Sequence, residues 1–180
     1  MFRPTVILLA LLTLVAPVAF GASLASDLRK GWGTQGALLL RTGDAMPKES
    51  FDSKPTSAQR TFGEQILHIS GANRFLLGFA DPQTPRPEIS RIDFSTFGQK
   101  ASGKAEILAA LKSSFDRGVA ALEGWDDDAV LDEVEGPPWV GKVTRAGLIT
   151  RILNHNMDIY GQIVVYLRLE GITPPASRQR

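Results

Sequence analysis

The last helical pattern of the chain, from about Thr144 to Glu170, constrains the fold more than any other feature. Residues that are apolar or carry a ring recur in it every three or four positions, which places them on one stripe of a helix. They are Leu148, Ile152, His155, Ile159, Ile163 and Tyr166. Gly171 can supply a left-handed cap, and the prolines at 174 and 175 cannot continue the helix. The pattern predicts one long terminal helix with His155 facing the core.

Three earlier segments show the same periodicity, and one of them carries the other histidine, His68. We expect the first of them to run from about Ser26 or Asp27 to Thr42. The second runs through Phe79 with Thr56 or Ser57 as its cap, and the third follows Ser102 as its cap and ends near Gly124. Four amphipathic helices predict an all-α four-helix bundle, whose sites form from side chains on facing helices. Both histidines lie on such helices.

Two connections interrupt this pattern. The segment from Pro82 to Gly103 is rich in Pro, Gly and Ser, which predicts a long irregular connection between the second and third helices. Before the last helix, an acidic run at 126–128 is followed by two short apolar runs, at 130–134 and 139–143, separated by Gly136, Pro137 and Pro138. A small hairpin or an irregular crossover would suit these runs. The acidic run lacks the ligand spacing of an EF-hand and is interpreted as a solvated, helix-flanking charge run.

The N-terminus has the layout of a secretory signal peptide. Arg3 precedes an apolar run at 6–15, and small residues follow at 16–25. Cleavage fits after Gly21, with Ala19 two residues before it, or after Ala25, with Ser23 two before it. We favour Ala25, which gives a signal peptide at 1–25 and a bundle domain at 26–180. The protein is then secreted or periplasmic, and it meets the membrane only if this segment stays uncleaved.

Composition narrows the available chemistry. The chain has no cysteine, which excludes disulfides, thiolate metal ligands and cysteine nucleophiles. It has 20 basic and 19 acidic residues, and the loss of Arg3 with the signal peptide balances them. This balance does not predict nucleic-acid binding, which needs clustered positive charge. Any site chemistry therefore comes from histidine, carboxylates and hydroxyls.

Two blocks of the chain stand out together: AMPKESFDSKPTSAQRTFGEQILHISGANRFL at 45–76 and HNMDIYGQIVVYLRLEGITPPAS at 155–177. They resemble the DinB-like (DinB/YfiT) superfamily of bacterial metalloenzymes, and the resemblance extends over nearly the whole mature chain. It implies a four-helix bundle, which agrees with the periodicity. It also implies a metal-dependent hydrolase or a thiol-dependent transferase as the kind of enzyme to consider.

The resemblance further implies a metal site. In the family, one histidine on the second helix and two on the fourth, four residues apart, bind one ion. His68 matches the first position and His155 the second, whereas Ile159 stands at the third and has no lone pair to donate. The implied cofactor is a divalent metal, zinc, nickel or iron, held at a site that is one imidazole short of the usual three protein ligands.

Two carboxylates could replace the missing ligand. Asp158 lies three residues after His155, and Glu64 lies four before His68, so each is within helical reach of a histidine. The alternative interpretation is structural for both. Asp158 would then be solvated or paired with Arg151 or Arg168, and Glu64 would complete the start of its helix.

Two functional classes follow. The first is a secreted DinB-like protein that binds a divalent metal and acts on a small molecule through it. The second is a non-catalytic bundle that has lost the third ligand and serves outside the cytoplasm as a ligand-binding or interaction module. The resemblance also allows a homodimer in either case.

Overall fold

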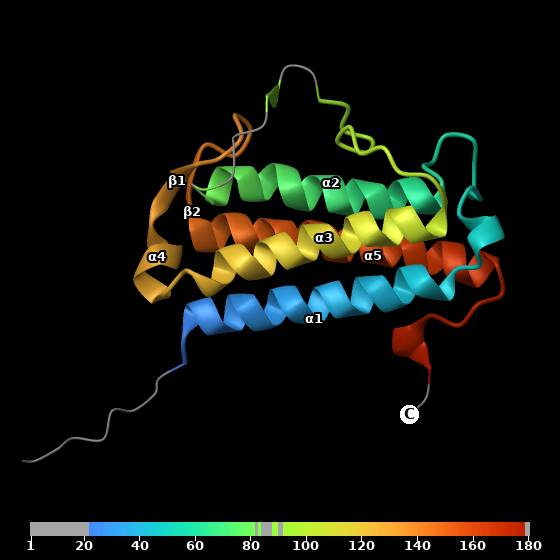
Figure 1. Cartoon of the computed structure of the whole chain (residues 1–180), viewed down its shortest axis with the longest axis horizontal. Helices are drawn as coiled ribbons and strands as arrows, with labels where there is room; N and C mark the ends of the chain where they lie inside the picture. The colour runs from blue at the N-terminus through green and yellow to red at the C-terminus, as the bar shows by residue number, and fades with distance from the viewer. Residues whose placement is uncertain (1–21, 82, 84–87, 90–91, 179–180) are drawn as a thin grey trace, which may run out of the picture.

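The structure is a computed structural model that describes residues 22–81, 83, 88–89 and 92–178. Four long helices run side by side along the long axis of the molecule (Figure 1): α1 (Leu24–Ala45), α2 (Phe62–Ala80), α3 (Gly103–Glu123) and α5 (Arg145–Leu169). The shorter elements are the 3-10 helices η1 (Lys48–Ser50) and η3 (Pro175–Ser177), the helix α4 (Asp127–Leu131) and the strands β1 (Glu133–Glu135) and β2 (Lys142–Thr144). The predicted all-α four-helix bundle is confirmed.

The long helices do not pack in chain order. Helix α2 packs mainly against α3 and α5, and α1 packs mainly against the same two helices. Consecutive helices α1 and α2 therefore occupy opposite corners of the bundle (Figure 1). This arrangement makes α2 and α5 direct neighbours, which brings the two histidine-bearing helices together.

A tryptophan fills the seam between α1 and α3. Trp32 is fully buried, and its Nε1–H donates a hydrogen bond of 2.9 Å to the carbonyl oxygen of Phe115. A Cβ added to Gly118 would lie 2.0 Å from Trp32 Cζ2, so only glycine lets the indole pack against α3 here. This seam is close-packed and structural, and it lies outside the α2–α5 contact.

Helix α5 agrees closely with the prediction. It begins after Thr144, whose hydroxyl accepts a hydrogen bond of 3.0 Å from the N–H of Gly147. It ends at Leu169, and Gly171 has the expected left-handed φ of +73°. The side chain of His155 is largely buried, as the helical stripe predicted.

The start of α2 corrects the prediction. The helix is capped by Thr61, five residues after Thr56 and four after Ser57, the two expected caps, and Thr61 forms a reciprocal capping box with Glu64. Helix α1 begins two residues before the expected Ser26, with Ser23 as its cap. Ser102 does precede α3, but its side chain makes no capping hydrogen bond, and Glu106 accepts from its backbone N–H instead.

The predicted hairpin is present before α5. Strands β1 and β2 pair antiparallel, with Val134 opposite Val143. The first apolar run, however, contributes to the short helix α4, which the sequence pattern did not predict. Pro82, Pro85 and Pro87 lie outside the described residues, and the end of α2 is defined by Asp81.

The predicted signal peptide lies almost wholly in residues 1–21, outside the part of the chain that the structure describes. Among the helices that are described, none combines the length and the apolar character needed to cross a membrane.

Candidate functional site

The two histidines of the chain meet between α2 and α5. Their ring centroids are 4.9 Å apart, and the ring planes are inclined at 64°. Each histidine comes from the middle of a long helix, so regular backbone hydrogen bonding fixes both Cα positions. The structure therefore brings together two residues that are 87 positions apart in the chain, as the bundle hypothesis required.

The tautomer of His68 follows from its partners. Its Nδ1 lies 3.0 Å from the carbonyl oxygen of Phe94 and 2.9 Å from that of Ser95. Carbonyl oxygens only accept, so Nδ1 carries the proton and Nε2 keeps its lone pair in the neutral ring. Burial lowers the pKa of His68 to about 4, and the nearby charge of Arg60 and the neighbouring His155 act in the same direction. His68 is therefore a neutral imidazole at pH 7.

His155 is less well satisfied. Its Nε2 is buried and has no hydrogen-bond partner among the described residues. Burial lowers the pKa of His155; the charge of Asp158 opposes this shift, and that of Arg60 adds to it. A buried polar atom without a partner is rare in folded proteins and requires a specific explanation. The ring of His155 thus has a buried nitrogen, Nε2, without a hydrogen-bond partner at the α2–α5 contact.

The residues here do not fit a three-ligand metal site. Ile159, one turn after His155, is 3% exposed and packs in the apolar core. Within the described part of the chain, no three His, Asp or Glu side chains are grouped so that they could hold an ion. Two imidazoles alone fall short of the three protein ligands typical of catalytic zinc.

The two candidate substitute ligands are both hydrogen-bonded elsewhere. Glu64 is exposed, and its Oε2 accepts a hydrogen bond of 2.7 Å from the backbone N–H of Thr61 in the capping box. Asp158 is exposed, and its Oδ2 accepts a 3.3 Å hydrogen bond from Gln162. The contact of Glu64 corresponds to its structural interpretation. Asp158 is solvent-exposed, as one branch of its structural interpretation expected, and its hydrogen-bond partner is Gln162, not Arg151 or Arg168.

A pocket of about 250 Å³ opens beside His155. Besides the histidine it is lined chiefly by Phe75, Phe94, Phe97, Trp139 and Arg151. Phe94 and Phe97 belong to the connection between α2 and α3, and Trp139 belongs to the turn between β1 and β2. No sequence pattern predicted a role for these aromatic residues. The available signal was three large rings in segments otherwise rich in Pro, Gly and Ser.

The approach of the α2–α3 connection to α2 depends on Gly71. A Cβ added to Gly71 would lie 2.5 Å from Phe97 Cβ and 2.6 Å from the carbonyl oxygen of Thr96. Phe97 itself has a φ of +53°, which is unusual for a bulky residue. The same connection receives the hydrogen bonds from His68. His68 is thus joined to the aromatic wall of the pocket, which consists of Phe75, Phe94, Phe97 and Trp139.

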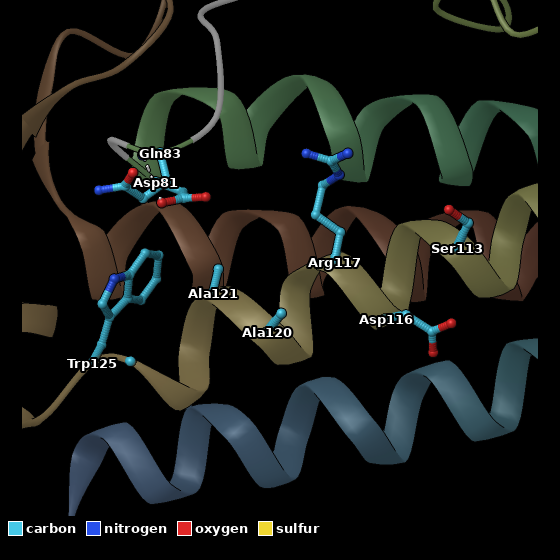
Figure 2. A pocket seen from close by; sticks show the side chains of 9 residues that line it. Asp81, Gln83, Ser113, Asp116, Arg117, Ala120, Ala121 and Trp125 are labelled. Atoms are coloured by element: carbon cyan, nitrogen blue, oxygen red, sulfur yellow. Dashed lines mark hydrogen bonds between the residues drawn. The ribbon is translucent and has the colours of Figure 1, made fainter.

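A second, larger hollow lies away from the histidines. It has a volume of about 610 Å³ and is lined by residues of α3 and of the end of α2. Figure 2 shows Arg117 extending from α3, with Asp81 and Trp125 to one side and Asp116 to the other. Both histidines and the aromatic wall are absent from its lining, so it is a separate surface feature.

The acidic run at 126–128 has structural roles. Asp126 caps α4 by accepting a hydrogen bond of 2.8 Å from the N–H of Ala129. Asp127 accepts hydrogen bonds of 2.8 Å from the Ser23 hydroxyl and from the Ala25 N–H, at the first turn of α1. These contacts lower the pKa of Asp127, the backbone bond from Ala25 being the largest cause. The run therefore flanks helices, as expected, and ties α4 to α1.

The four-helix bundle brings a histidine from each of two adjacent helices to one contact, which is where helix bundles build their side-chain sites. The sequence profile of the DinB superfamily matches residues 33–163, more than half of the chain. The chain belongs to the DinB superfamily. A search of curated proteins found no significant match.

Solved structures share the fold at low sequence identity. A DinB-like protein from Bacillus cereus ATCC 10987 is 17% identical, with a TM-score of 0.69 over 83% of this chain and 95% of that one. The DinB-like protein YjoA from Bacillus subtilis is 18% identical, with a TM-score of 0.63 over 86% and 99%. YfiT from Bacillus subtilis, described as a probable metal-dependent hydrolase with an unusual four-helix bundle topology, is 16% identical, with a TM-score of 0.61 over 83% and 89%.

Proposed function

We propose that this protein is an extracytoplasmic member of the DinB superfamily that binds a small molecule beside His155 and holds no tightly bound catalytic metal ion. The observation that carries the proposal is the pair of neutral imidazoles next to a pocket, with buried Ile159 one turn beyond His155. A side chain without a lone pair cannot complete a three-ligand site. The Nε2 of His155 is buried without a hydrogen-bond partner, and the ring of His155 lines the pocket.

Isothermal titration with zinc and with nickel tests the metal half of this proposal. We expect weak binding to the mature wild type and binding at least about 100-fold tighter to an Ile159→His variant, in which a third imidazole lies one turn from His155. Met157→His is the matched control, because it adds an imidazole to an exposed position on the same helix. Tight wild-type binding that is lost in His155→Ala would overturn the proposal.

A metal-dependent hydrolase, as YfiT is described, is the second candidate. The observation that favours it is Asp158, whose charge acts on His155 and whose exposed carboxylate could swing from Gln162 to an ion. Hydrolysis of a chromogenic ester that stops on chelation, returns with zinc and is lost in Asp158→Asn would support this candidate. Retention of the same activity in Asp158→Asn would exclude Asp158 as the third ligand.

For localisation, we propose export with cleavage after Gly21, which departs from the Ala25 site favoured by sequence alone. A cut after Ala25 would remove Ser23, the cap of α1, together with both hydrogen bonds to Asp127. Intact mass of exported protein should show Ala22 as the first residue. Ser23→Asp distinguishes the two sites. It replaces the small residue two positions before Ala25 with a charged one, and it leaves the Ala19 and Gly21 pair unchanged. An N-terminus at Ser26, or an uncleaved chain held at the membrane, would contradict the proposal.

A further inference from the structure

The pocket beside His155 exposes aromatic side chains that have no structural need to be exposed. Trp139 is 58% exposed and Phe94 is 44% exposed, although both contact the buried ring of Phe75. Exposed apolar groups gathered around a hollow are typical of ligand sites. The two exposed rings come from different connections and converge on the same pocket, which a chance surface residue would not do.

The rings pack together as one aromatic cluster beside the pocket. Phe75 and Trp139 are nearly parallel, at 9°, with centroids 6.0 Å apart. Phe94 stands at 75° to Trp139 and at 81° to Phe75, so its contact with each ring is edge-to-face. Flat aromatic faces and edges favour stacking and edge-to-face contact with another planar ring. The volume of about 250 Å³ is below the roughly 300–1,000 Å³ of common small-molecule pockets. It suits a compound of one or two rings.

The charge of the pocket has one sign. Arg151 lines it, one turn before His155 on α5, and no carboxylate does. Arg151 is exposed, and it makes no hydrogen bond or ion pair with another described residue, so its guanidinium donors face solvent. An unpaired arginine at the edge of an apolar pocket matches a carboxylate, which it can bind through two parallel hydrogen bonds.

The wall is held in place before any ligand arrives. His68 donates to the carbonyl oxygens of Phe94 and Ser95, and Gly71 allows Phe97 to lie directly on α2. The positive φ of Phe97 is a strained conformation for a non-glycine residue, and such strain recurs at ligand clamps. A wall fixed by these contacts reduces the ordering cost of binding.

We infer that this pocket binds a planar aromatic carboxylate, with its ring against Phe75, Phe94 and Trp139 and its carboxylate paired with Arg151. This inference rests on the proposed small-molecule function and names its ligand class. His155 borders the same space with its ring, while its unpaired Nε2 is itself buried.

The test is isothermal titration of the mature protein with 2-naphthoate and with 2-acetylnaphthalene, which has a similar shape and no charge. We expect 2-naphthoate to bind the wild type at least about tenfold more tightly than the ketone, a difference typical of a charge-assisted contact. Arg151→Gln should remove this preference and leave ketone binding within about twofold, which also shows that the variant is folded. Trp139→Leu should weaken both compounds.

Arg117→Gln is the matched control, since it removes an exposed arginine of the other hollow and should change neither affinity. Equal binding of the two compounds with no effect of Arg151→Gln, or no binding of either compound to the wild type, would overturn the inference. Neither result bears on metal affinity. Tight binding of zinc to the wild type would contradict the proposed absence of a bound metal and would leave the ligand class untouched. The two failures are therefore distinguishable.

Discussion

His155 and Asn156 are consecutive on α5, yet the two residues meet α2 in opposite ways. Asn156 is fully buried, and its Nδ2 donates a hydrogen bond of 2.9 Å to Asn73 Oδ1. Asn73 donates in turn to Ser114 on α3, whose hydroxyl donates to the carbonyl oxygen of Leu111. His155 meets His68 without any hydrogen bond between them. The asparagine contact joins three helices through hydrogen bonds, although Asn156 Oδ1 has no partner among the described residues. The histidine contact contains no hydrogen bond and lies beside a pocket.

This difference separates a structural polar cluster from a candidate site. Buried polar groups that are hydrogen-bonded to each other specify how helices align, and removing one of them leaves its partner unsatisfied. A polar atom that has no partner to lose contributes little to stability. The asparagine contact should therefore matter for folding and the histidine contact for binding.

The largest expected effect is on the asparagine side. Asn73→Leu removes the acceptor for Asn156 and the donor to Ser114, so we expect the free energy of unfolding to fall by about 3 kcal/mol. Urea unfolding followed by circular dichroism measures this loss. Zinc and naphthoate affinities of the folded variant should stay unchanged. A loss as small as that of a histidine variant would remove the contrast.

The second effect is a pH dependence on the histidine side. The folded state holds the pKa of His68 near 4, below the unfolded value of 6.5, so the unfolded chain takes up the proton first as the pH falls. Stability from this group is complete above pH 6.5 and is lost toward pH 4, with a loss of about 2 kcal/mol at pH 5.

Urea unfolding at pH 7 and at pH 5 tests this dependence, with His68→Gln as the control that should flatten it. The contribution of His155, whose pKa is also lowered, remains in that variant. The pKa values of Asp93 and Asp127 are lowered from their usual 3.8. These two carboxylates therefore take up protons below pH 3.8, outside the range between pH 7 and pH 5. A free energy of unfolding that increases as the pH is lowered from 6.5 to 5 would contradict the neutral assignment of His68.

A third, smaller effect concerns the aromatic wall. Gly71→Ala forces Phe97 and Thr96 away from α2, and we expect a net loss of about 1 kcal/mol together with weaker naphthoate binding. Gly161→Ala is the matched control on α5, because a Cβ there meets open space. It should gain roughly 0.5–1 kcal/mol from helix propensity and leave binding alone. Equal effects of the two substitutions would show that Gly71 is not needed for close approach.

The smallest effect is expected from His155→Ala. Removing an imidazole whose buried Nε2 has no partner relieves a desolvation cost and loses some packing, so the free energy of unfolding should change by less than about 1 kcal/mol. Naphthoate binding should weaken, because His155 lines the pocket. A loss of about 3 kcal/mol, equal to that of Asn73→Leu, would mean that His155 is a structural residue like its neighbour.

Much of the bundle could be predicted because its signals are local. The apolar stripe of α5, the cap at Thr144 and the glycine at 171 are all within a few residues of the features they define. The start of α2 was predicted too early, although Thr61 and Glu64 have the capping-box spacing that marks the true start. Short α4 was missed because five residues are too few to show a helical period.

The candidate site was predictable only in part. The resemblance named His68 and His155, and helical periodicity placed His155 inward, so their meeting was expected once α2 and α5 were neighbours. The hydrogen bonds of Glu64 and Asp158 depend on side-chain conformation, which sequence spacing does not specify. Arg60, which lowers the pKa of both histidines, precedes the helix and gave no periodic signal.

By itself, the sequence determined four amphipathic helices, the inward face of α5 and the isoleucine one turn beyond His155, because each of these depends on residue type and helical period. Only the tertiary structure decided that two irregular connections bring Phe94, Phe97 and Trp139 onto one pocket beside Arg151. Such a convergence depends on contacts between residues far apart in the chain, like that of Gly71 with Phe97, and no local pattern encodes them.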